Sequence, residues 1–91
     1  MRFTWDEPKR LQVLKRRGVD LLRAAQILEG PTIEYEDRRH DYGETRIVAT
    51  GEYKGEYFTV VYTPQAGAFH IITAWRAGRQ ARHRHQKRYP R

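Results

Sequence analysis

The spacing of hydrophobic residues changes at Gly30-Pro31, and this change limits the possible folds more than any other feature of the sequence. Before it, apolar residues recur every three or four positions, which is the spacing of amphipathic helices. After it, apolar and polar residues alternate, which is the spacing of β-strands. Because Gly-Pro also ends a helix, the sequence predicts helices up to this point and a sheet beyond it.

Two helices are predicted in the first part of the chain. Asp6 is a good N-cap for the first, because its carboxylate can accept hydrogen bonds from the free amides of the first turn, and Gly18 should end this helix as a left-handed residue. Leu11 and Leu14 are expected to share one face of it. Asp20 should cap the second helix. Its buried stripe is predicted to consist of Leu21, Ala24, Ala25 and Leu28, with Leu22 and Ile27 at the edges.

Four strands are predicted after the helices, over residues 32–37, 44–50, 56–63 and 68–74, with the first at an edge. The short connections around Gly55 and Gly67 indicate hairpins, so the sheet should be largely antiparallel. Phe3 and Trp5 form either a short extended lead-in or an apolar anchor.

The C-terminal segment predicts a third helix that ends at Pro90. Its small apolar face against the sheet should consist of Ala74, Ala77, Ala81 and His85. The predicted order is therefore ααββββα, an α+β fold in which an antiparallel sheet of about four strands packs with helices. At 91 residues, the chain is expected to form a single domain over residues 1–91.

Positive charge is concentrated at the C-terminus. Residues 75–91 contain seven Lys/Arg and no carboxylate, whereas residues 1–74 contain eleven of each sign, so the net charge of +7 lies in the last segment. Such segregation points to a polyanionic partner, most commonly nucleic acid. A solvated basic helix, or a tail that docks on an acidic protein, would give the same pattern.

Several kinds of site are excluded or disfavoured by composition. The chain has no Cys and no Ser, so disulfides and the common acyl-transfer nucleophiles are missing. His83 and His85 would point in different directions on a helix, and no metal or other cofactor is expected. No apolar run is long enough for a membrane span, and no signal peptide is present, so a cytoplasmic protein is expected.

RNA cleavage is a reaction that this composition can support. The 2′-hydroxyl attacks the adjacent phosphate, and the protein supplies orientation, a cationic cradle and proton transfer. Arg46 is a candidate phosphate ligand, although a salt bridge to Glu44 or Asp41, or a position on an exposed face of the sheet, would also explain it. If the last helix packs on the sheet, Arg76 and Arg79 could meet Arg46 over one edge.

Further candidates are assigned by residue type. Tyr62, at the end of a strand, is either a rim residue or a group that stacks on a base or transfers a proton. His83 or His85 could act as acid or base. Additional contacts to nucleic acid are expected from Arg38, Arg39, Arg82, His83 and Lys87.

Four segments, in order, resemble the BrnT family of small toxins from bacterial toxin–antitoxin pairs. These are FTWDEPKRLQVLKRRGVD, DRRHDYGETRIVATG, FTVVYT and IITAWRAGR, and the likeness extends from Phe3 to about Tyr89. The resemblance implies the RelE-like ribonuclease fold. The positions that match the family pattern are Trp5, Asp6, Lys9, Glu44, Arg46, Tyr62, Arg76 and Arg79.

The resemblance also implies a function and a partner. It implies a metal-independent endoribonuclease toxin of a type II system, with Arg46, Arg76 and Arg79 as the phosphate cradle and Tyr62 in stacking or proton transfer. Its partner would be a ribbon–helix–helix antitoxin in a heterotetramer. Trp75 and Ala81 stand where the family commonly has Arg and Glu. A catalytically weak or inactive member that only binds nucleic acid or its antitoxin is therefore the alternative.

Overall fold

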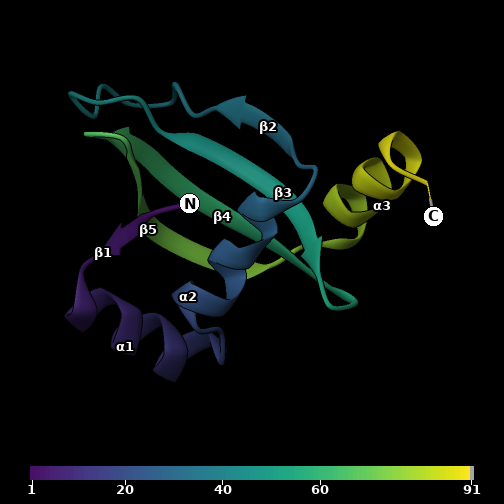
Figure 1. The fold of residues 1–91 in the computed structure, drawn as a ribbon, viewed down its shortest axis with the longest axis horizontal. Coiled ribbons are helices and arrows are strands. Elements are labelled where there is room, and N and C mark those ends of the chain that lie inside the picture. The colour runs from purple at the N-terminus through teal and green to yellow at the C-terminus, as the bar shows by residue number, and fades with distance from the viewer. Residues whose placement is uncertain (91) are drawn as a thin grey trace.

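A five-stranded sheet with strand order β1-β5-β4-β3-β2 forms the centre of the molecule (Figure 1). The computed structural model describes residues 1–90. In chain order, its elements are β1 (Phe3–Trp5), α1 (Glu7–Arg17), α2 (Leu21–Ala24), the 3₁₀ helix η1 (Ala25–Glu29), β2 (Ile33–Glu36), β3 (Ile47–Tyr53), β4 (Glu56–Gln65), β5 (Ala68–Arg76) and α3 (Arg79–Arg88). The predicted α+β class is confirmed, as are the four antiparallel strands and the edge position of β2.

The fifth strand, β1, was not predicted as part of the sheet. It pairs in parallel with β5, in the register Phe3↔Phe69 and Trp5↔Ile71. Three residues are too few to show a clear alternation, and a parallel pair needs no local turn, so the sequence carries little signal for this strand. Its pairing fixes the start of α1 at one edge of the sheet (Figure 1).

Two tight hairpins join the three longest strands, as predicted. Lys54 and Gly55 connect β3 to β4, with φ of 49° and 84°, and Ala66 and Gly67 connect β4 to β5, with φ of 49° and 78°. Two consecutive positive φ values suit the twist of two-residue hairpins, which explains glycine at the second position of each turn.

The main hydrophobic core lies between one face of the sheet and α1, α2 and η1. Phe58 and Val60 of β4 are almost fully buried against Leu21 and Ile27. At Gly51 the chains approach so closely that an added Cβ would lie 3.0 Å from the Ile27 Cβ. Ile27 is therefore a central core residue, and its predicted place at the edge of the stripe is wrong.

The face of α1 that carries Leu11 and Leu14 is not its buried face. Leu11 and Leu14 are 53% and 40% exposed, and Val13 is the buried residue of this helix. Five basic residues among the eleven of α1 leave few apolar positions, so the helical period alone did not identify the inward side.

Helix α3 packs at the far end of the sheet from α1 (Figure 1). His85 is 4% exposed, its ring lies 5.6 Å from that of Tyr57, and its Nε2 lies 2.9 Å from the Pro31 carbonyl oxygen. The inward position predicted for His85 is confirmed.

The predicted start of the helix is wrong, because β5 extends to Arg76 and contains Ala74. Alanine fits either element, so the boundary was not readable from the sequence.

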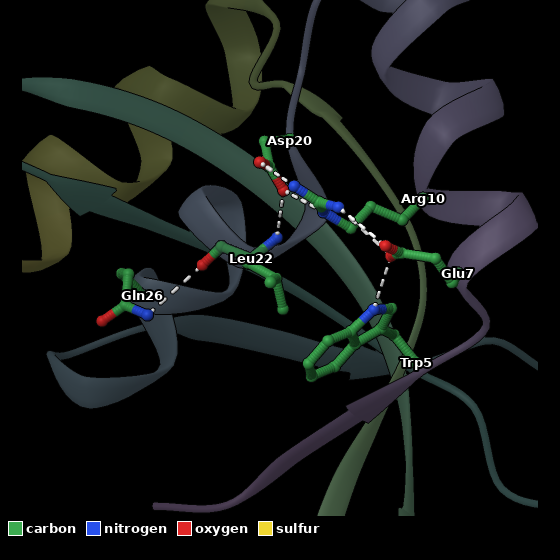
Figure 2. Close-up of polar contacts among 6 residues, drawn as sticks. All are labelled: Trp5, Glu7, Arg10, Asp20, Leu22 and Gln26. Atoms are coloured by element: carbon green, nitrogen blue, oxygen red, sulfur yellow. Dashed lines mark hydrogen bonds and ion pairs between the residues drawn. The ribbon is translucent and has the colours of Figure 1, made fainter.

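A polar network holds the start of α2 against α1 (Figure 2). Arg10 donates from Nε and Nη2 to the two carboxylate oxygens of Asp20, at 3.0 and 2.9 Å, and from Nη1 to Glu7. Asp20 Oδ1 also accepts from the Leu22 amide, which confirms its predicted capping role. Asp6 precedes α1 as predicted, but its side chain makes no capping hydrogen bond.

Asp20 should make folding stability depend on acid pH. The hydrogen bonds from Arg10, more than the one from the Leu22 amide, lower the pKa of Asp20. Its contribution is therefore complete above the unfolded value of about 3.9 and is lost as pH falls through the lower, folded value. We expect Asp20→Ala to lower the free energy of unfolding by about 1–2 kcal/mol at neutral pH.

Urea unfolding of wild type, Asp20→Ala and Asp20→Asn between pH 3 and 7 would measure this dependence. Asn keeps an oxygen for the Leu22 amide, so it should cost less than Ala. A difference between wild type and Asp20→Asn that stays constant below pH 4 would contradict the proposed linkage.

Candidate active site

The sheet has a second face, directed away from α1 and α2, which we call the distal face. Val48, Val61, Thr63 and Trp75 lie on it, because they alternate with residues that belong to the core. Helix α3 covers one end of the distal face through Tyr57. The other end carries the segment of residues 37–46 that leads into β3.

A cavity of about 310 Å³ brings together charged residues from distant parts of the chain. We call it the Arg46 cavity. Its charged and titratable lining consists of Asp6, Lys9, Glu44, Arg46 and His70. Asp6 follows β1, Lys9 lies in the first turn of α1, Glu44 and Arg46 precede β3, and His70 lies in β5. Gln65, Ile71 and Ile72 complete the lining.

Arg46 stacks on an aromatic ring and has no carboxylate partner among the described residues. Its guanidinium lies over the Tyr42 ring, 3.9 Å from the centroid, and the Tyr42 hydroxyl donates to Asp37. Arg46 Nε is buried and has no hydrogen-bond partner. Within residues 1–90, Arg46 forms no ion pair, so the predicted alternative of a salt bridge to Glu44 or Asp41 is wrong. Because no carboxylate pairs with Arg46, its guanidinium can bind an anion at the cavity that it lines.

His70 lies on the same face as Arg46. Its Nδ1 lies 2.8 Å from the Thr4 hydroxyl oxygen of β1, so one ring nitrogen is oriented by a neighbour. The register between β4 and β5 shifts after Val61, where β5 has one extra residue, Ile72, which lines the cavity. Such bulges re-aim side chains and are common beside active sites. An oriented imidazole beside two carboxylates, a lysine and an arginine can bind an anion and transfer protons.

The structure separates Arg46 from Arg76, so their predicted meeting is wrong. In the sheet register, Ile47, Tyr62 and Ile71 lie in one row, whereas Gly51, Phe58 and Arg76 lie in another. The rows are four β3 residues apart, roughly 13 Å along the strand. Arg76 also shares the face of Phe58, where its Nη1 donates to Glu56 at 3.1 Å. The prediction failed because Arg76 belongs to a strand rather than to the last helix.

Arg76 is part of a compact ion-pair group with Glu56 and Arg23. Glu56 accepts from Arg23 at 2.6 Å as well as from Arg76. The two guanidinium groups, that of Arg23 first, lower the pKa of Glu56. Arg76 therefore has a carboxylate partner, whereas Arg46 has none.

Tyr62 is buried in the hydrophobic core, on the face of the sheet opposite the distal face. It is 6% exposed, its hydroxyl donates to Glu34 at 3.0 Å, and its ring packs against Phe69. Burial, followed by the hydrogen bond to Glu34, raises the pKa of Tyr62 to about 12. The predicted stacking of Tyr62 on a base is wrong, because its ring is enclosed by the core.

The basic residues of α3 form a separate surface. Arg79, Arg82 and His83 line a second cavity of about 450 Å³ with Ala77 and Gln86. Arg82 lies over the Tyr57 ring, and Lys87 is exposed nearer the end of the helix. We call this the α3 surface. Arg38 and Arg39 lie elsewhere, beyond β2, where they pair with Glu36 and Asp37.

His70 is the cavity residue that sequence reasoning missed. Asp6 was interpreted as a helix cap, and Lys9 was named only through the family resemblance. The sequence did carry one signal for it. His70 alternates with the apolar residues Phe69 and Ile71 in a strand, which places its imidazole on the distal face. The partners of His70 come from other segments, which no local pattern reveals.

Residues 1–90 contain neither a group of metal-binding side chains nor a membrane-spanning helix. Among residues 1–90, no three His, Asp or Glu side chains are grouped so that they could hold a metal ion. No helix in the same range is long and apolar enough to span a membrane.

Comparison with known proteins identifies the family. A family model described as the ribonuclease toxin BrnT of type II toxin–antitoxin systems matches residues 5–81. A crystal structure of the Brucella abortus ribonuclease toxin BrnT matches with a TM-score of 0.65 and 25% identity, covering 87% of this chain and 99% of that one. No sequence among the curated proteins matches significantly. The family match contains the motif residues of the Arg46 cavity, and the chain therefore belongs to the BrnT family of ribonuclease toxins.

Proposed function

We propose that this protein cleaves RNA without a metal ion and that the scissile phosphate binds in the Arg46 cavity. One observation carries the proposal. Three segments far apart in sequence line one cavity, namely Asp6 with Lys9, Glu44 with Arg46, and His70, and no carboxylate among the described residues pairs with Arg46. Membership of a ribonuclease toxin family supports the same reaction. The protein would act on RNA in the cytoplasm.

Each charged group has a place in the reaction. Arg46 binds the non-bridging phosphate oxygens in pairs, and Lys9 adds a second cation as negative charge develops. A base removes the 2′-hydroxyl proton as that oxygen attacks phosphorus, and an acid protonates the departing 5′-oxygen. His70, Asp6 and Glu44 are the candidates for these two transfers. The products would be a 2′,3′-cyclic phosphate and a 5′-hydroxyl end.

Other predicted residues take supporting roles in this proposal. The α3 surface binds the RNA backbone outside the cavity, because Arg79 and Arg82 have no carboxylate partner among the described residues. Arg76 holds the end of β5 through Glu56. Tyr62, with its raised pKa, is protonated near neutral pH and positions Glu34 rather than removing a proton.

Removing the cavity cations should abolish cleavage while the fold persists. We expect Arg46→Ala and Lys9→Ala to lower kcat by about 10²–10³-fold each, the loss typical of one group that stabilises the transition state. Wild-type protein should cut a labelled single-stranded RNA in EDTA, leaving 2′,3′-cyclic phosphate ends. Lys15→Ala, which removes the same charge from the exposed side of α1, is the matched control.

The same assay separates the proposal from its alternative. Cleavage that requires a divalent ion, or equal rates for Arg46→Ala and Lys15→Ala, would refute the proposed site. If RNA binds to the wild-type protein but stays intact, the alternative is supported, namely a protein that binds nucleic acid without cleaving it.

The α3 surface should affect binding rather than chemistry. Replacing both Arg79 and Arg82 with Ala should raise KM and leave kcat within about twofold, because these residues would bind phosphates away from the reacting atoms. The slope of log K against log salt should fall by about 1.4, at roughly 0.7 for each lost contact to a single strand. Filter binding from 50 to 300 mM salt would measure this slope. If the slope is the same for the variant and the wild type, RNA does not bind to the α3 surface.

We propose further that the cognate antitoxin is a ribbon–helix–helix protein that silences the toxin in a heterotetramer. Type II systems neutralise the toxin with a protein, and the family match supports that level of assignment. Co-expression with the product of the adjacent gene should yield a complex whose light-scattering mass corresponds to two copies of each chain. A 1:1 mass, or RNA cleavage by the complex at the rate of the free toxin, would contradict this assembly.

A further inference from the structure

We propose that the distal face carries a nucleobase slot, built by Tyr35, Val48, Val61 and Trp75, that receives an unpaired base of the RNA. The proposal rests on the function given above, and it names a substrate contact outside the Arg46 cavity. The slot is a separate cavity of about 240 Å³. Residues 36–39 complete its lining as one wall.

The sheet register gives the slot a flat apolar floor with an aromatic residue at each side. Tyr35, Val48 and Val61 are consecutive partners across β2, β3 and β4, and Trp75 lies on β5 opposite Thr59, next to Val61. Val48 and Val61 are 5% and 7% exposed, so they form the floor. Tyr35 is 60% exposed and Trp75 is partly exposed, so both rings have area available for a ligand.

The walls of the slot are fixed before any ligand arrives. Asp37 accepts from the backbone amide, Nε and Nη2 of Arg39, and also from the Tyr42 hydroxyl. On the opposite side, Arg17 donates to the Thr73 hydroxyl and the Ala74 carbonyl, and its guanidinium lies 5.7 Å from the centre of the Trp75 ring. A pre-ordered slot loses little side-chain freedom on binding.

The guanidinium groups around the slot favour a nucleotide over an apolar side chain. Arg38 and Arg39 at its rim are paired with Glu36 and Asp37, but their side chains are each 79% exposed, and Arg17, which has no carboxylate partner among the described residues, lies beside Trp75. An apolar floor with exposed guanidinium groups fits a flat base attached to an anionic phosphate. Val48 also follows Arg46 by two residues, roughly 7 Å along β3, so one chain of RNA can occupy both places.

Trp75 fluorescence provides a direct test in a Trp5→Phe background, because the chain has two tryptophans. The probe is a six-residue all-deoxy oligoadenylate, which lacks the 2′-hydroxyl and cannot be cleaved by the proposed reaction. We expect it to quench Trp75 on binding. The same oligomer without bases should bind roughly 5- to 100-fold more weakly and should not quench, because base–aromatic stacking accounts for that factor.

Two variants keep the test independent of folding. Trp75→Leu removes the stacking ring but could disturb β5, whereas Tyr35→Ala alters a largely exposed residue. Tyr35→Ala should raise the Kd of the oligoadenylate by at least fivefold, and Leu11→Ala, an exposed apolar residue on α1, should leave it unchanged.

The outcomes separate the slot from the proposed catalytic function. Quenching that depends on bases and on Tyr35 supports the slot even if no RNA is ever cut. Equal affinity for the oligomers with and without bases overturns it, even if the Arg46 cavity proves catalytic. A Trp75 signal that responds to the antitoxin but not to the oligoadenylate overturns it too, since the face would then bind protein.

Discussion

The parallel pairing of β1 with β5 is the constraint on which the Arg46 cavity depends. Three backbone positions, from Phe3 to Trp5, align with Phe69 to Ile71 and deliver the following residue, Asp6, to the distal side of the sheet. The first turn of α1 then places Lys9 in the same cavity. Because β5 and β4 separate β1 from β3, a side chain near the N-terminus can share a cavity with Arg46 only through this arrangement. Sheet pairing thus determines which charges meet.

The cations of the chain divide into two groups according to their carboxylate neighbours. Arg10 with Asp20 and Arg76 with Glu56 join different elements of the fold, and Arg39 pairs with Asp37 within one loop. Within residues 1–90, Lys9, Arg46, Arg79 and Arg82 have no such ion pair. These four cations lie in the Arg46 cavity and on the α3 surface, where a polyanion can bind without first displacing a carboxylate. The local pairing of charges therefore says more about function than the net charge.

The sequence predicted the parts of the fold that local physics determines. Gly18 at the end of α1, Asp20 at the start of α2 and the hairpin glycines each act over a few residues. It could not predict where β5 ends and α3 begins, because Ala74 to Ala81 suit both structures. This boundary determines where Arg76 lies. As the last residue of a strand, Arg76 points to a different face from the one it would reach on a helix, so it does not meet Arg46. Arg46 was predicted from its residue type, but the neighbours that make a cavity around it come from long-range pairing, which the family motifs indicated and local spacing did not.

The attachment of α3 has a consequence for the dynamics of the molecule. His85 and Tyr89 hold the helix through contacts to the carbonyl groups of Pro31 and Thr32, and His85 is the one fully buried residue of the helix. Few apolar contacts and many solvent-exposed backbone hydrogen bonds characterise segments that open locally before a protein unfolds. Helix α3 can therefore detach while the sheet and its core stay intact. Its amide protons would then exchange with solvent through a local opening, far sooner than those of β3 and β4, and a polyanion bound along the helix would slow that exchange.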